Sequence, residues 1–139
     1  MRPLTCFLTT AVLLMFVSCK TQTFEPSFKT KLIGKWKYTG GSGGFTGKPE
    51  PVNPLVSKII EFKSDGKYVK YINSDPDTQG TYDIIKSKSI YSSLEDNAIR
   101  FDPQSGSPRT GLIATINDDK LVLADNVYDG FSAGYTRVK

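Results

Sequence analysis

The sequence predicts an all-β domain, either a sandwich or a closed barrel, on three observations. Short segments that alternate apolar with polar residues recur from residue 33 to the end of the chain. Turn signals such as Ser64-Asp65-Gly66 and Asn117-Asp118-Asp119 separate these segments. Outside the apolar N-terminus, helix is expected only as one turn near residues 27–32. Many short strands with almost no helix are typical of both architectures.

About eight strands of mostly six or seven residues account for the alternating segments. They are expected at 33–39, 56–63, 67–73, 78–85, 110–116, 120–124 and 134–139, with the pieces 89–93 and 97–101 forming one interrupted hairpin or one bulged strand. Residues 74–77 and 102–109 are expected loops. Residues 40–54 contain five glycines and three prolines, which predicts a long irregular loop that does not pair as a strand.

The first residues have the pattern of an export signal. A short N-terminus with Arg2 precedes a mostly apolar run at 6–17, and Ser18-Cys19 follows. Twelve residues of helix span about 18 Å, too little for a hydrocarbon core of about 30 Å. Residues 16–19 (FVSC) resemble a lipobox, although Phe16 stands where leucine is usual. This resemblance implies cleavage after residue 18 and lipid attachment to Cys19, the alternative being an ordinary signal peptide.

The expected organisation is therefore a signal peptide (1–18), a lipidated tether (19–31) and one domain (32–139). Lipid on Cys19 would anchor the chain to a bacterial membrane in the cell envelope. Lys20 stands where aspartate would, by resemblance to enterobacterial sorting, favour the inner membrane, so the outer membrane is expected.

Composition argues against several classes of function. The 18 Lys and Arg residues only modestly exceed the 14 Asp and Glu residues and are scattered, so no nucleic-acid partner is expected. The chain has no histidine, no nucleophile elbow, no P-loop and no metal-ligand spacing. We therefore expect neither catalysis nor a cofactor nor a metal. Both cysteines, Cys6 and Cys19, fall in or beside the signal, so no disulfide is expected in the mature domain.

A family resemblance rests on Gly34-Lys35-Trp36 and on Arg137 near the end of the chain. A Gly-x-Trp on the first strand and an arginine on the last resemble the lipocalin signature. Three further segments, 62–68, 80–84 and 119–123, resemble repeats of small lipocalin-like lipoproteins of Bacteroidetes. The resemblance implies an up-and-down antiparallel barrel whose closed end is plugged by Trp36, with Arg137 packed over the indole. It also implies that residues 40–54 cover the open mouth. Phe45, an aromatic residue among the glycines of this segment, is either a gate or a single exposed surface residue.

Alternation predicts which side chains face the barrel interior. They are Trp36, Tyr38, Ile60, Phe62, Tyr68, Tyr82, Ile84, Leu121 and Leu123. The same parity turns Lys58 and Lys70 inward, where one or both can meet an acidic head group. The alternative is that the strands begin or bulge there and the lysines extend to water. Candidate ligand-binding residues are thus Phe45, Lys58, Tyr68, Lys70 and Tyr82.

Two functions remain open at this point. One is a non-catalytic carrier of a small apolar or amphipathic molecule at the cell envelope. The other is a protein-interaction module, such as an envelope inhibitor or accessory subunit, whose barrel is filled by its own side chains. A cavity of about 300 Å³ or more favours the carrier, and a packed barrel with an exposed apolar patch favours the module.

Overall fold

The computed structural model describes residues 27–90, 92, 94–106, 112–117 and 119–139. The predicted signal peptide (1–18), Cys19 and most of the predicted tether (19–31) lie outside these residues. No helix in the described part of the chain is long and apolar enough to span a membrane.

The described residues form one short helix and nine strands. In chain order they are α1 (Phe28–Leu32), β1 (Gly34–Gly43), β2 (Pro49–Glu50), β3 (Lys58–Phe62), β4 (Lys67–Ile72), β5 (Asp75–Lys88), β6 (Glu95–Phe101), β7 (Leu112–Asn117), β8 (Lys120–Ala124) and β9 (Phe131–Arg137). The helical turn predicted near residues 27–32 is thus confirmed, and Ser27 caps it by accepting the Thr30 backbone N–H at 3.3 Å.

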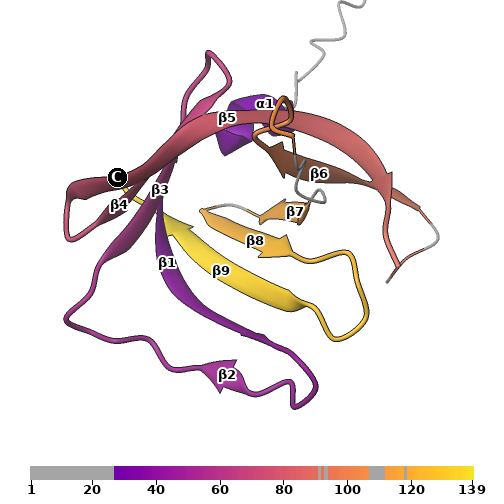
Figure 1. Cartoon of the computed structure of the whole chain (residues 1–139), viewed down its shortest axis with the longest axis horizontal. Coiled ribbons are helices and arrows are strands. Elements are labelled where there is room, and N and C mark those ends of the chain that lie inside the picture. The colour runs from indigo at the N-terminus through magenta and orange to yellow at the C-terminus, as the bar shows by residue number, and fades with distance from the viewer. Residues whose placement is uncertain (1–26, 91, 93, 107–111, 118) are drawn as a thin grey trace, which may run out of the picture.

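Eight of the strands close into an antiparallel barrel. Strands β3 to β9 are arranged in sequence order, each paired with its neighbour in the chain. β1 pairs with both β3 and β9 and so closes the ring. Figure 1 shows the resulting ring of strands, with β5 arching over the barrel and β2 lying beside the outer part of β1. The predicted all-β barrel of about eight antiparallel strands is confirmed, and the sandwich alternative is excluded.

The buried core lies at the end of the barrel covered by α1. Its largest fully buried side chains include Leu32 from α1, Trp36 from β1, Phe62 from β3 and Tyr68 from β4. Edge-to-face ring contacts join Phe62 to Tyr82 at 5.0 Å and Tyr68 to Phe101 at 4.8 Å between centroids. Phe28, which falls within the segment predicted as tether, also packs against this core.

Two strands are much longer than expected. β1 has 10 residues where strand was predicted at 33–39, and β5 has 14 where strand was predicted at 78–85. β5 pairs with two strands in succession: its residues 75–81 pair with β4 and its residues 82–88 pair with β6. A strand of this length has to bend to follow both partners, and the curvature closes the barrel.

The expectation that residues 40–54 form no strand is wrong. β1 continues to Gly43, pairs there with Phe131 of β9, and receives β2 on its other edge through Ser42 and Pro49. The glycines serve close backbone approach, since a Cβ on Gly41 would lie 2.5 Å from the Ser132 carbonyl oxygen. Pro49 is tolerated because β2 is a two-residue edge strand.

The expected loop at residues 74–77 is also wrong. Asn73 and Ser74 both have positive φ (50° and 76°) and form the tight turn between β4 and β5. Pro76 therefore lies inside β5, opposite Tyr71 and beside an irregularity in the β4–β5 register. Among the described residues of the predicted pieces 89–93 and 97–101, strand occurs only within Glu95–Phe101. The last strand begins at Phe131 rather than at Gly134.

Candidate functional site

The barrel contains a cavity of about 490 Å³ away from the end covered by α1. β1, β3, β4, β5, β7, β8 and β9 all contribute to its lining, and β2 adds one residue. Its apolar side chains are Ile59, Ile60, Ile72, Leu112, Leu123, Phe131 and Ala133. Ile60 and Leu123 also belong to the buried core, so the core forms part of the cavity wall. A cavity of this volume with a largely apolar wall has the dimensions of a small-molecule site.

Five charged side chains line the cavity: Glu50, Lys58, Lys70, Asp77 and Asp125. All three carboxylates accept hydrogen bonds from neighbouring groups. Glu50 accepts from the Tyr38 hydroxyl at 2.8 Å, Asp77 from the Thr78 hydroxyl at 2.8 Å, and Asp125 from the Phe131 backbone N–H at 2.9 Å. They come from three different parts of the chain and form no single acidic cluster.

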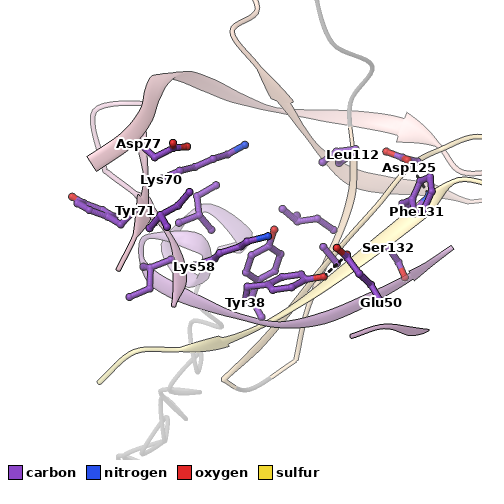
Figure 2. A pocket seen from close by; sticks show the side chains of 16 residues that line it. Tyr38, Glu50, Lys58, Lys70, Tyr71, Asp77, Leu112, Asp125, Phe131 and Ser132 are labelled. Atoms are coloured by element: carbon purple, nitrogen blue, oxygen red, sulfur yellow. Dashed lines mark hydrogen bonds between the residues drawn. The ribbon is translucent and has the colours of Figure 1, made fainter. Parts of the chain in front are cut away.

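Both lysines lie at inward positions of their strands, but β3 begins at Lys58, which is exposed, whereas Lys70 is half-buried. Lys58 on β3 and Lys70 on β4 both line the cavity, and Figure 2 shows their side chains reaching into it. The Lys58 Nζ lies 5.6 Å from the centroid of the Tyr38 ring. The Lys70 Nζ lies 5.7 Å from the Tyr68 ring and 5.6 Å from the Phe101 ring, both of which belong to the core. The Lys70 ammonium therefore stands where the cavity meets the core.

Tyrosines form one wall of the cavity. Tyr38 and Tyr135 face each other across the β1–β9 pairing with ring centroids 5.7 Å apart. Burial and the hydrogen bond to Glu50 raise the pKa of Tyr38 to about 12. Burial also raises the pKa of Tyr135, whose hydroxyl makes no hydrogen bond to any described residue. Both phenols are therefore neutral at physiological pH and able to donate hydrogen bonds.

The other three candidate ligand-binding residues do not line this cavity. Tyr68 and Tyr82 are buried in the core, where Tyr68 donates to Asp102 at 3.0 Å and Tyr82 donates to the Lys63 carbonyl oxygen at 2.8 Å. Phe45 is 94% exposed between β1 and β2. Its ring thus makes no lid contact over the cavity in this structure.

The three residues of the predicted signature meet at the end covered by α1. Trp36 is fully buried, and its indole N–H donates to the Leu32 carbonyl oxygen at 2.8 Å. The Arg137 guanidinium carbon lies 4.2 Å from the centroid of the Trp36 ring. The same guanidinium donates to the carbonyl oxygens of Ile33 (3.0 Å) and Lys31. Together these contacts tie α1 to the first and last strands.

Gly34 completes this arrangement. Its φ is +129°, and a Cβ there would lie 2.9 Å from Nη1 of Arg137. Glycine is therefore required by the backbone conformation and by the approach of the guanidinium.

Sequence reasoning missed several cavity residues. Glu50 was hidden in a segment predicted as loop, and Asp77 was assigned to a turn. Ser132 and Ala133 precede the point where the last strand was expected to begin. The alternation Ala133-Tyr135 was a usable signal, since both residues share the inward face with Arg137 on β9.

Within the described part of the chain, no group of three or more His, Cys, Asp or Glu side chains could hold a metal ion. No protein-family model, curated protein or solved structure matches the chain. Function is therefore inferred from the cavity and the residues that line it.

Proposed function

We propose that this chain is a lipid-anchored protein of the bacterial cell envelope whose barrel carries a small amphipathic molecule, without catalysis. One observation supports the carrier above all: the barrel is not filled by its own side chains but contains a cavity of about 490 Å³. This volume exceeds the threshold of about 300 Å³ that separates a carrier from a filled barrel. The anchor itself rests on the lipobox-like residues around Cys19.

The lining supports an amphipathic rather than a wholly apolar ligand. Leu112, Leu123 and Ala133 offer a surface for an apolar portion, whereas Lys58 and Lys70 offer charge. A wholly apolar ligand would place hydrocarbon against the half-buried Lys70 ammonium, which is costly.

Native mass spectrometry of the processed protein, extracted from its own host in mild detergent, tests the carrier. The expected result is a protein mass increased by a bound small molecule. Ala133→Phe should fill the cavity and abolish the extra mass, because Ala133 lines it. Val122→Phe is the matched control, since Val122 lies on the neighbouring strand and is 42% exposed. A ligand-free protein, or a ligand that survives Ala133→Phe, contradicts the proposal.

A second candidate, the protein-interaction module, is favoured by exposed aromatic side chains. Phe45 is 94% exposed, Tyr128 84% and Phe131 66%, and Phe131 pairs with Gly43 beside the β1–β2 connection. The same spectra test it, because a protein partner would add a much larger mass. Phe45→Ser with Tyr128→Ser should remove that partner and leave a cavity ligand in place.

A further inference from the structure

The two lysines of the cavity are placed to act on one group. Lys58 pairs with Ile72 and Lys70 pairs with Ile60, so the lysines are diagonal neighbours on the same face of the β3–β4 pair. Diagonal positions have Cβ atoms about 7–8 Å apart, within reach of two long side chains that bend toward a common point. Two ammonium groups brought toward a common point repel each other unless an anion lies between them.

The surroundings of Lys58 do not supply that anion. No described carboxylate lies within 4.0 Å of its Nζ, and its ammonium instead lies over the Tyr38 ring. The three carboxylates of the cavity are engaged with a tyrosine hydroxyl, a threonine hydroxyl and a backbone N–H. The described residues therefore supply no ion-pair partner for Lys58, and a bound ligand can supply one.

A third donor faces the same cavity. The Tyr135 hydroxyl makes no hydrogen bond to a described residue, and its ring contacts that of Tyr38, over which the Lys58 ammonium lies. Lys58 and Lys70 carry ammonium groups, which can only donate hydrogen bonds, and Tyr135 adds a hydroxyl that can also donate. The apolar wall of Leu112, Leu123 and Ala133 belongs to the same cavity.

We infer that the ligand of this barrel is an anionic amphiphile whose carboxylate, phosphate or sulfate head group binds between Lys58 and Lys70 and accepts a hydrogen bond from Tyr135. Its apolar chain lies against Leu112, Leu123 and Ala133. This inference rests on the proposed carrier function and adds the sign of the head-group charge and the residues that bind it.

Calorimetric titration of the processed protein from its own host with amphiphiles of equal chain length tests the inference. The probes are dodecanoate, dodecyl phosphate and dodecyl sulfate as anions, dodecanol as a neutral molecule and dodecyltrimethylammonium as a cation, each below its micelle concentration. At least one anion should bind about a hundredfold more tightly than dodecanol, because each charge-assisted contact contributes about tenfold. The strongest of the three anions identifies the head group.

Variants assign the effect to the lysines. Lys58→Gln and Lys70→Gln should each weaken anion binding about tenfold and leave dodecanol unchanged, whereas Lys58→Arg should retain most of the affinity. Tyr135→Phe should weaken it roughly threefold to tenfold. Lys37→Gln is the matched control, because Lys37 is an exposed lysine of β1 outside the cavity lining. The thermal unfolding temperature of each variant shows whether weaker binding comes from a destabilised fold. This check matters most for Lys70, whose ammonium lies over the core rings of Tyr68 and Phe101.

Three results overturn the inference, and they differ from failure of the carrier function. Equal binding of dodecanol and the anions would keep the carrier but remove the charge preference. Tightest binding of dodecyltrimethylammonium, weakened by Asp77→Asn or Asp125→Asn, would assign the head group to the carboxylates. Anion binding that survives the double substitution of Lys58 and Lys70 by glutamine would place the head group elsewhere. If no probe binds and extracts contain no ligand, the carrier function itself fails.

Discussion

The contact between Trp36 and Arg137 can be measured as a coupling free energy. The perturbations are Trp36→Leu, which removes the aromatic ring and the indole N–H, and Arg137→Met, which removes the charge and keeps a long apolar side chain. Both are combined in a double variant. Because the guanidinium carbon lies 4.2 Å from the ring centroid, the two losses should not be additive.

The structure sets the expected magnitudes. Trp36→Leu should cost about 3 kcal/mol, the lower end for truncating a buried tryptophan, because leucine refills part of the space. It also leaves the Leu32 carbonyl oxygen without its indole donor. Arg137→Met should cost about 2 kcal/mol, since charge-assisted bonds to two backbone carbonyls are lost. The ion pair with Asp119, at 3.5 Å and half-exposed, adds less than about 1 kcal/mol.

The coupling itself should be about 1 kcal/mol, because Trp36 is fully buried while the Arg137 side chain keeps 26% of its surface exposed. Urea unfolding followed by circular dichroism gives the four stabilities of the cycle. Trp36→Leu combined with Arg100→Met is the control, since Arg100 instead forms a two-point contact with Asp83. Coupling below about 0.5 kcal/mol for Trp36 with Arg137, or equal coupling in the control cycle, would refute the stacking argument.

Three further outcomes are expected. Cys19→Ser should abolish metabolic labelling with palmitate, and labelling that persists would show that Cys19 is not the acceptor. Gly41→Ala should destabilise the barrel by about 1–3 kcal/mol in urea unfolding, because its Cβ would lie 2.5 Å from a carbonyl oxygen of β9, whereas Gly106→Ala, with nothing within 4 Å, should be nearly neutral. Tyr38 should ionise near pH 12 in an ultraviolet titration, and Glu50→Gln should lower that pKa without restoring it fully, because burial remains. Since the folded-state pKa exceeds the ordinary value of 10.0, the stability linked to Tyr38 is fully present below pH 10 and is lost as pH rises toward 12.

Alternation along the strands carried most of the correct predictions. Trp36, Ile60, Phe62 and Tyr68 were assigned to the interior by parity, and all four are buried. Parity succeeds here because a one-residue slip in register would expose every one of these side chains together. The same rule brought Lys58 to the cavity, although a lysine gives no local sign of facing inward.

The wrong loop prediction at residues 40–54 arose because glycines and prolines report on the backbone and give no pattern of side-chain burial. Gly40 and Gly41 have no side chain to alternate, so a strand built from them cannot be distinguished from a flexible loop by pattern. These glycines form a strand because they pair with β9, about ninety residues later in the chain, for example Gly41 with Ala133. Glu50 enters the cavity lining for the same reason, because β2 exists only through its pairing with β1.

The division of the barrel into a core end and a cavity end links stability to ligand binding. Lys58 and Ser132 line the cavity without belonging to the core, so substitutions there should act on binding more than on folding. Ile60 and Leu123 belong to both, with 3% and 4% of their surface exposed. A ligand seated on these two side chains would bind the folded barrel and not the unfolded chain. At a hundred times its dissociation constant, such a ligand adds about 2.7 kcal/mol to the free energy of unfolding. The thermal stability of the protein as isolated from its host, compared with protein stripped of small molecules, therefore reports on occupancy of the cavity even before the ligand is identified.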